Sequence, residues 1–398
     1  MMRIAYICTD PGIPVFGTKG ASVHVQEIVR VLLEAGHTVD LYHRRRGGPT
    51  PAALALAAGD GRLELIELPP TTTREPAPRE RELMAAEASL ARLLAERHAH
   101  RPYAAVYERY ALFGRAGMRF ARTHGIPAIL EVNAPLPIEQ RRHRVLVHEA
   151  EADAVAREVL ADADVAVCVS EAVAEWARRQ TPRARAIVVP NGVDVERIRP
   201  VSREAGAPFT VGFVGTLKPW HGTETLVEGF ARFAAVNDAA RLLLVGDGPE
   251  APALRDRCRA LGIADRVDFA GAVEPSEVPG WLGRMDIGVA PYPAGGDGYF
   301  SPLKLVEYMA AGLAVVASAV GQVPELLEHG RAGVLVPGSD PAALAGAFGL
   351  LASDPERRAQ FGAAARAAVV GTRTWMRVAE RSFDASGVDL RARAGAVA

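Results

Sequence analysis

The stretch RIAYICTDPGIPVFGTKGASVHVQEIVRVLLEAGHTVDLY, residues 3–42, indicates the fold of the first part of the chain. It begins with RIAYIC, a short β-rich apolar run of the kind found in buried strands. A loop with glycine and proline follows, and apolar residues at offsets 0, 3, 4, 7 and 8 from Val25 then form one face of a helix. Gly36 stands just past that helix, and Val39 to Tyr42 resume a strand. This order predicts the start of a parallel doubly wound sheet.

The same opening recurs in the second half of the chain. The run FTVGFVG from Phe209 reads as a strand, TLKPWHG as a loop, and a helical face with Leu226, Phe230 and Phe233 follows. Further strands are predicted in the first half at 104–107, 128–132, 165–169 and 186–189, and in the second half at RLLLVGDGPE, RVDFAG, DIGVAPY, AVVAS and GVLV. We therefore predict an α/β protein with two tandem Rossmann-like, doubly wound domains that face an interdomain cleft, where a ligand would bind.

The segment between residues 44 and 101 is the hardest part to interpret. PPTTTREPAPRE, residues 69–80, is predicted to be an exposed linker without helix or strand, and residues 80–98 return to helical spacing. Turn residues in VPNGVD, 189–194, precede a polar stretch that ends in REAGAP, so we place the domain boundary near residues 194–207.

Composition narrows the class of protein. A chain of 398 residues is long enough for two to three domains at roughly 100–200 residues each. The apolar fraction of 49%, the charged fraction of 23% and the net charge of -1 are ordinary for a soluble protein and argue against a nucleic-acid binder. The three cysteines share no metal-ligand spacing, which favours a reducing compartment. No apolar stretch reaches the ~20 residues of a membrane span, so we expect a cytoplasmic protein without a transmembrane segment.

The loop before the first helix carries Gly17-Thr18-Lys19-Gly20. Glycines at this place let backbone N–H groups approach a phosphate or a sugar, and the helix N-terminus favours negative charge. The alternative is that the glycines only form a turn. Dinucleotide binding is disfavoured, because the loop lacks G-x-G and Asp40 lies within the second strand instead of at its end.

A second informative segment is GGDGYFSPLKLVEYMAAGLAVVAS, residues 295–318. A glycine-rich loop precedes Ser301-Pro302, where a helix is predicted to begin, and Lys304 and Glu307 share one face of that helix. A helix N-terminus with a lysine and a hydroxyl suits an anion, and a glutamate one turn later can accept two hydrogen bonds from a vicinal diol such as a ribose. The alternative is a surface ion pair on an ordinary helix.

SPLKLVEYMAAGLAVVAS resembles the nucleotide-sugar segment of the retaining glycosyltransferases of family 4 (group 1), which have the GT-B fold. GTKGASVHVQEIVRVLLEAGHTVDLY is similar to their N-terminal glycine loop and helix. PNGVD, FVGTLKPWHG, LLLVGDGPE, VDFAGAV and DIGVAPY recur in that family's order and spacing, so the resemblance covers nearly the whole chain. It implies an N-terminal acceptor-binding domain at 1–194, completed by a C-terminal helix at 374–398, and a donor-binding domain at 195–373.

The resemblance also implies the positions that bind the donor. Glu307 matches the second glutamate of the family's E-x7-E motif, which holds the donor ribose, and Tyr299 stands where the first glutamate normally contacts the donor sugar. Phe300, Ser301 and Leu303 match the loop whose backbone holds the diphosphate. Val273 corresponds to the position whose backbone contacts the nucleobase, Gly17 and Gly20 belong to the N-terminal glycine loop, and Thr216 belongs to the loop TLKPWHG. The implied donor-binding residues are therefore Gly17, Gly20, Thr216, Val273, Tyr299, Phe300, Ser301, Leu303 and Glu307.

The catalytic positions depart from the family at several places. The family usually carries Arg and Lys on the diphosphate where this chain has Thr216 and His221, with Lys218 between them. We expect Lys218 and Lys304, or a protonated His221, to supply the positive charge. Asn133, within EVNAP, occupies the place of a frequent family histidine and can still bond a sugar hydroxyl. The predicted catalytic residues are Lys218, His221, Lys304 and Asn133.

Acceptor binding is assigned to Lys19, His24 and Glu131. His24 would face the cleft or pack as an ordinary helix histidine, and Glu131 would contact the acceptor or pair with a nearby arginine. The runs Arg141-Arg142-His143-Arg144 and Arg44-Arg45-Arg46 favour a solvated face, with contact to a membrane surface or an acidic acceptor as the alternative.

The implied reaction moves a sugar from a nucleoside diphosphate sugar, UDP- or GDP-linked, to an unidentified acceptor hydroxyl with retained configuration. No cofactor and no metal are expected, because lysines can stabilise the diphosphate and Asp247 has no second acidic ligand beside it. Peripheral contact with the inner membrane face stays open, as does the oligomeric state. The alternatives are a nucleotide-sugar epimerase or hydrolase of the same fold, and a non-catalytic nucleotide-sugar-binding protein.

Overall fold

The computed structural model describes residues 1–203, 206–295 and 298–391. The chain divides into two compact units. The N-terminal unit contains Met1–Asn191, Tyr299–Ser301 and Trp375–Ala398, and the C-terminal unit contains Gly192–Gly298 and Pro302–Thr374. The chain therefore passes briefly into the N-terminal unit at residues 299–301 and returns to it at Trp375.

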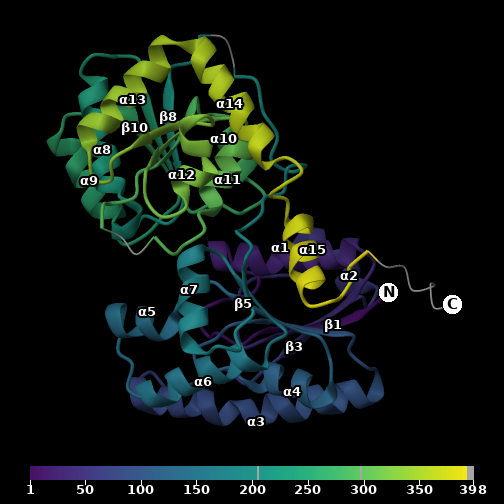
Figure 1. Ribbon diagram of the computed structural model, residues 1–398. Coiled ribbons are helices and arrows are strands. Elements are labelled where there is room, and N and C mark those ends of the chain that lie inside the picture. The colour runs from purple at the N-terminus through teal and green to yellow at the C-terminus, as the bar shows by residue number, and fades with distance from the viewer. Residues whose placement is uncertain (204–205, 296–297, 392–398) are drawn as a thin grey trace. The chain divides into compact units, whose positions relative to one another are not determined.

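A parallel seven-stranded sheet forms the centre of the N-terminal unit (Figure 1). The strands follow the order β3-β2-β1-β4-β5-β6-β7, so the direction of winding reverses between β1 and β4. The predicted strands of this half are confirmed, and β3 is one that the sequence interpretation missed. The strands are β1 Arg3–Cys8, β2 Thr38–His43, β3 Leu63–Glu67, β4 Ala105–Arg109, β5 Ala128–Val132, β6 Val165–Cys168 and β7 Ala186–Val188.

Helices cover both faces of this sheet. In Figure 1, α3, α4 and α6 lie on one face, and α1, α2 and α15 lie on the other. The helices are α1 Gly20–Glu34, α2 Ala52–Gly59, α3 Pro76–His100, α4 Ala116–His124, α5 Leu136–His143, α6 Glu149–Asp162, α7 Glu171–Gln180 and α15 Trp375–Ala385. The predicted linker at 69–80 is wrong in its second part, because α3 already begins at Pro76. Proline suits the first turn of a helix, where its missing N–H costs no hydrogen bond.

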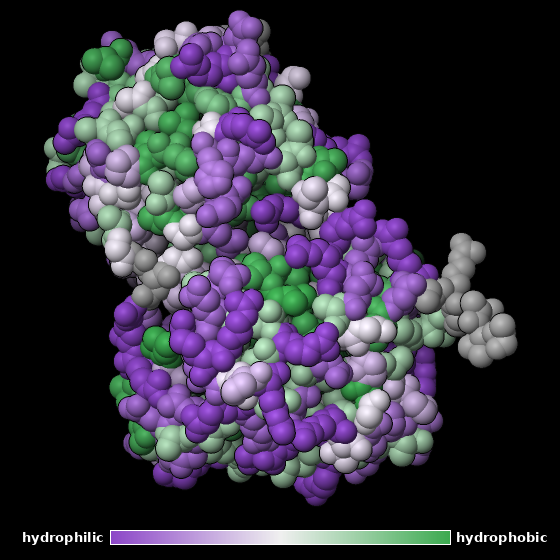
Figure 2. All heavy atoms as spheres, in the orientation of Figure 1, coloured by the Kyte–Doolittle hydropathy of each residue, from purple (hydrophilic) through white to green (hydrophobic). Residues whose placement is uncertain are grey.

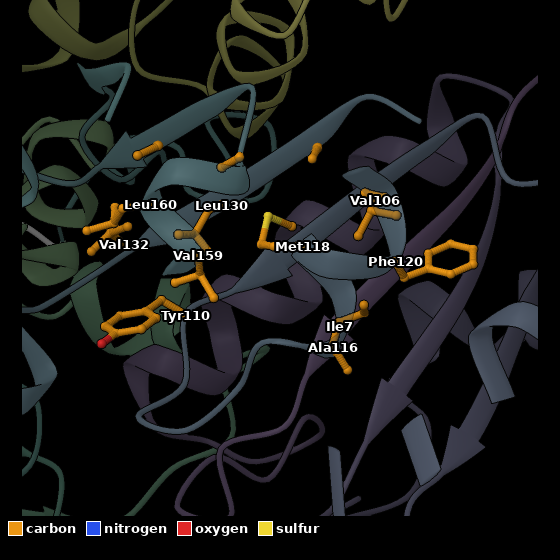
Figure 3. Close-up of a cluster of buried hydrophobic side chains, with 14 of the residues drawn as sticks. Ile7, Val106, Tyr110, Ala116, Met118, Phe120, Leu130, Val132, Val159 and Leu160 are labelled. Atoms are coloured by element: carbon orange, nitrogen blue, oxygen red, sulfur yellow. The ribbon is translucent and has the colours of Figure 1, made fainter. Parts of the chain in front are cut away.

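One apolar core of the N-terminal unit lies between the sheet and the helices on the α3 side. Ile7, Val106, Leu130 and Val132 of the sheet pack here with residues of α4 and α6, among them Met118 and Val159 (Figure 3). Each fully buried side chain of this size contributes about 1.5–3 kcal/mol relative to exposure. This apolar layer holds the strands in fixed register. The loops that follow the strands therefore begin at fixed positions.

The C-terminal unit repeats the architecture with six parallel strands in the order β10-β9-β8-β11-β12-β13. All the strands predicted for this half are confirmed. They are β8 Thr210–Val214, β9 Arg241–Val245, β10 Val267–Gly271, β11 Ile287–Ala290, β12 Ala314–Ser318 and β13 Val334–Val336. The α-helices are α8 Thr223–Ala234, α9 Ala251–Ala260, α10 Val278–Leu282, α11 Leu303–Ala310, α12 Val323–Leu326, α13 Pro341–Ser353 and α14 Pro355–Val369. Short 3-10 helices are η1 Pro219–His221, η2 Ala264–Arg266 and η3 Glu328–Gly330.

Hydrophilic and hydrophobic residues are interspersed on the face seen in Figure 2. One prediction of a solvated charge run is wrong in part, because Arg44 is buried. Its guanidinium donates to the Pro69 carbonyl oxygen at 3.1 Å and lies 3.7 Å from the Glu87 carboxylate, while Arg45 and Arg46 are exposed.

Among the helices in the described part of the chain, none has both the length and the hydropathy needed to cross a membrane.

Candidate functional site

The carboxyl ends of β8 and β11 meet where the winding of the C-terminal sheet reverses, the usual ligand position in such sheets. The loop after β8 runs from Gly215 to Gly222 and contains Thr216, Lys218 and His221. The segment after β11 contributes Tyr292. The structure thus brings three of the predicted residues together on one loop.

Glycines allow this loop to pack directly against neighbouring backbone. A Cβ at Gly246 would overlap the Gly215 carbonyl oxygen, and one at Gly248 would overlap the backbone of Leu217. Asp247 between them accepts a hydrogen bond from the Gly248 N–H at 2.7 Å, so its carboxylate stabilises the turn in which it lies. The two glycines of VGDGP are the signal for this close backbone approach.

Lys304, in the first turn of α11, reaches the same loop. Its side chain is 9% exposed, and its Nζ lies 4.1 Å from the centre of the Phe213 ring and 5.5 Å from that of Tyr292. A Cβ at Gly215 would lie 3.0 Å from this Nζ, so the amine stands beside the start of the loop. Nζ has no hydrogen-bond partner within the described residues. Burial lowers the pKa of Lys304 to about 7, although Glu307 opposes this shift.

His221 occupies the end of the loop, where its surroundings disfavour the protonated form. Its Nδ1 lies 2.5 Å from the Thr216 carbonyl oxygen, which can only accept, so Nδ1 carries the proton. Burial, and then the positive charge of Lys304, lower the pKa of His221 to about 3. Without a bound anion the protonated form of His221 is therefore disfavoured, and the positive charge beside the loop comes from the lysines. Lys218 stays close by, with its Nζ 4.5 Å from the centre of the Trp220 ring.

The remaining predicted donor positions of the C-terminal unit lie on two elements. Leu303 is the first residue of α11, and Glu307 follows Lys304 by one turn and is partly exposed. The electrostatic influence of Glu307 on Lys304 is consistent with a shared helix face. Val273 follows the end of β10 and is half-buried.

In the N-terminal unit, Glu131 at the end of β5 is the centre of a buried polar network. Its carboxylate accepts hydrogen bonds from Arg109 at 2.5 Å, from Tyr107 at 2.9 Å and from His24 at 2.8 Å, and Asn133 donates to it as well. Burial alone would raise the pKa of Glu131, but His24 and Arg109 lower it to about 2. Of the two alternatives for Glu131, the structure contains the arginine pair.

The predicted acceptor and glycine-loop residues are divided between buried and exposed positions. His24 is 4% exposed and contacts the edge of Trp375 at 4.9 Å between ring centres, so it packs inside the N-terminal unit. Lys19 and Gly20 are exposed at the start of α1, with Lys19 at the N-cap position. Gln26 donates to the carbonyl oxygen of Gly17 at 2.9 Å and thereby fixes the loop to the helix.

The segment Tyr299–Ser301 is bound to the N-terminal unit by hydrogen bonds that sequence reasoning missed. The Ser170 hydroxyl donates to the Tyr299 carbonyl oxygen at 2.6 Å, and the Asn191 amide Nδ2 donates to the Ser301 carbonyl oxygen at 3.0 Å. The Tyr299 hydroxyl donates to Glu139 at 3.3 Å. Only the position of Ser170 before a helix and of Asn191 in PNGVD could have drawn attention to these residues.

Comparison with known protein families matches both halves of this chain. The description "Glycosyltransferase Family 4" matches residues 18–197, and "Glycosyl transferases group 1" matches residues 208–354. The chain belongs to glycosyltransferase family 4. The two matched ranges correspond to the two sheets, and the family's GT-B fold agrees with the two parallel-stranded α/β units.

Curated relatives are similar to this chain in sequence, and solved structures are similar to it in fold. The chain is 28% identical over 382 residues to a D-inositol 3-phosphate glycosyltransferase of Acidothermus cellulolyticus, covering 89% of this chain and 81% of the relative. A sucrose-phosphate synthase of Thermosynechococcus elongatus has a similar fold, with a TM-score of 0.72, 21% identity, and coverage of 96% of this chain and 97% of that one. Anabaena HepE in complex with UDP has a TM-score of 0.69 and 19% identity, with coverage of 96% and 98%.

Proposed function

We propose that this family 4 glycosyltransferase transfers a hexose from a UDP- or GDP-linked sugar to an acceptor hydroxyl, with retention of the anomeric configuration and without a metal ion. No cofactor is needed beyond the nucleotide sugar, which is a substrate. We place the reaction in the cytoplasm. The acceptor is a polyol, and the name of the Acidothermus relative makes inositol phosphates the first to test.

The single observation that carries this proposal is the environment of Lys304. A buried amine without a hydrogen-bond partner is costly, and proteins keep such groups chiefly where a ligand completes them. Lys304 lies beside the β8 loop and in the first turn of α11, whose N-terminal N–H groups favour an anion. A diphosphate supplies the negative charge that this position lacks.

The chemistry follows from the charge that develops on the leaving group. As the bond between the sugar C1 and the diphosphate breaks, its electron pair stays on the phosphate oxygen. A bound diphosphate raises the proton affinity of Lys304, so its ammonium, with that of Lys218, stabilises the departing anion. These two lysines perform the work that a metal ion performs in other transferases, which supports a metal-independent reaction. Neutral His221 holds the loop through Thr216.

Glu307 and the acceptor complete the reaction. The two carboxylate oxygens of Glu307 can accept both hydroxyl protons of a ribose diol. The acceptor oxygen bonds to C1 on the face that the diphosphate leaves, and its proton passes to the departing phosphate oxygen. Such a route needs no protein base and gives retention. The UDP complex of Anabaena HepE, which has a similar fold, supports uridine as the first base to test.

Calorimetry with UDP, GDP and dTDP, each with its sugar conjugates, tests the donor. The Glu307→Ala variant should weaken nucleotide binding at least tenfold and abolish transfer, because the ribose diol loses both acceptors. Glu274→Ala removes an exposed glutamate of the same unit and should leave both unchanged. Full turnover in Glu307→Ala would overturn the assignment of the site. Consumption of the bare donor without any acceptor would instead identify an epimerase or hydrolase.

A further inference from the structure

Tyr308 of α11 joins the two strands between which the winding of the C-terminal sheet reverses. Its side chain is fully buried. Its hydroxyl oxygen accepts from the Val214 N–H at 2.7 Å, and the hydroxyl donates to the Val289 carbonyl oxygen at 3.4 Å. Burial raises the pKa of Tyr308 well above its usual value, so the hydroxyl keeps the proton that it donates. Because Val214 ends β8 and Val289 belongs to β11, one side chain is bonded to both strands.

The hydroxyl stands where direct pairing between the two strands has ended. Within the described residues, the register of β8 with β11 ends at Gly212 and Gly288, whereas β8 stays paired with β9 as far as Val214. Beyond that point, the Val214 N–H and the Val289 carbonyl oxygen both bond to Tyr308. The hydroxyl therefore bridges two strand ends that no longer pair with each other.

A glycine in β11 makes room for the tyrosine ring. A Cβ at Gly288 would lie 2.4 Å from the Tyr308 ring, so the ring would have to shift. A Cβ at Gly212, the register partner of Gly288, would instead lie 2.0 Å from the Sδ of Met285. Of these two paired glycines, only Gly288 therefore bears on the position of Tyr308.

The bridge lies next to the start of the β8 loop. Val214 directly precedes Gly215, where the loop begins, and a Cβ at Gly215 would lie 3.0 Å from the Lys304 Nζ. Lys304 and Tyr308 are four residues apart on α11, so they share one face of the helix. All of these residues belong to the C-terminal unit. Tyr308 thus ties the helix that carries the buried amine to the strand that leads into the loop.

We propose that Tyr308 is a positioning residue for the donor diphosphate: by bridging the ends of β8 and β11, it fixes the Lys304 amine relative to the β8 loop, which carries Lys218. This inference rests on the proposed function, in which these two lysines stabilise the departing diphosphate. Without the hydroxyl, two buried backbone groups lose their partner, and the strand ends must move to regain one. A displacement of about 1 Å is enough to weaken contacts to charged phosphate oxygens substantially.

Two substitutions disturb the bridge by different routes, and each has a matched control. Tyr308→Phe removes the hydroxyl and keeps the ring. Its control is Tyr6→Phe, because Tyr6 is also fully buried but its hydroxyl has no hydrogen-bond partner among the described residues. Gly288→Ala keeps the hydroxyl and displaces the ring. Its control is Gly212→Ala, which disturbs Met285 instead of Tyr308.

The experiment is calorimetric titration of each full-length variant with UDP and GDP, repeated with uridine and guanosine as competitors. A nucleoside contains the base and the ribose but no phosphate, so the ratio of nucleotide to nucleoside affinity reports the phosphate contacts. In Tyr308→Phe and Gly288→Ala this ratio should fall about tenfold, which corresponds to about 1.4 kcal/mol, while the nucleoside affinity stays the same. Tyr6→Phe and Gly212→Ala should keep the wild-type ratio, although Gly212→Ala should lower the unfolding temperature. Hydrogen exchange at Val214 should be faster only in the two bridge variants.

Two results would overturn the positioning role. One is a wild-type affinity ratio in Tyr308→Phe; if that variant does not fold, a wild-type ratio in Gly288→Ala decides in the same way. The other is an equal loss of nucleotide and nucleoside affinity, which would give Tyr308 a general structural role. Wild-type protein that binds neither UDP nor GDP would contradict the proposed function itself, an outcome distinct from both.

Discussion

Replacing Lys304 with methionine should stabilise the C-terminal unit while abolishing donor binding. In the free protein, burial lowers the pKa of this lysine from 10.5 to about 7. Protonation therefore favours the unfolded chain, in which the amine is solvated. At ~1.4 kcal/mol for each pH unit, the cost of keeping the ammonium in place has a ceiling of about 5 kcal/mol. Methionine has a similar length and needs no hydrogen bond, so we expect a realised gain of about 1–4 kcal/mol.

The stability gained by the Lys304→Met substitution should depend on pH in a definite direction. Below pH 7 the lysine is protonated in both states, and the full cost is present. As pH rises from about 7 toward 10.5, the folded protein has already lost the proton while the unfolded chain still binds it. The stability difference between Lys304→Met and the wild type should therefore be largest at pH 7 and below, and should shrink at pH 9.

Hydrogen exchange in increasing denaturant, read at the amides of β8 and β12, gives the free energy of unfolding of this unit separately from its neighbour. Lys218→Met is the matched control, because it makes the same substitution at a half-buried lysine of the neighbouring β8 loop. We expect it to change stability by less than about 0.5 kcal/mol. A Lys304→Met protein that is less stable than the wild type, or whose gain does not vary with pH, would refute the reasoning.

Three further predictions concern buried groups. Glu131→Gln should cost about 3 kcal/mol at pH 7, because the carboxylate's low pKa of about 2 stabilises the fold above pH 4.5; denaturation followed at pH 7 and pH 3 should show this cost falling by about 2 kcal/mol in acid. Burial, and then Glu87, raise the pKa of Glu108 to about 8, so Glu108→Gln should stabilise the protein increasingly from pH 5 to pH 8, and a flat profile would contradict this. Gly222→Ala should cost more than about 2 kcal/mol in thermal unfolding, since φ is +67° and its Cβ would overlap the Pro291 carbonyl oxygen; Gly262→Ala, with φ +68° and open space, should cost about 1 kcal/mol by the same measurement.

The regular elements were largely predictable from local patterns. Buried parallel strands are continuous apolar runs, and the helix after β1 shows its apolar face at regular offsets. The prediction of helices within residues 52–80 failed for a local reason. The helix α2 is apolar on all sides, and α3 begins within a proline-rich stretch that also suits a linker.

The candidate site was predictable in its residue types but not in its protonation states. The pattern placed Lys304, His221 and Lys218 near one loop, yet nothing local indicates that His221 is neutral. That state arises because burial and the charge of Lys304 both oppose a second proton.

The sequence by itself determined the two doubly wound sheets, their loops and the residue types of the candidate site, because strand, glycine and helix periodicities are local properties. Only the tertiary structure decided which polar atoms are partnered. Glu131 meets Arg109 and His24, and Ser170 and Asn191 meet the 299–301 backbone, across separations of 22 to 129 residues. Hydrogen bonds need donors and acceptors within about 3 Å, and no local pattern specifies which distant side chains the fold brings that close.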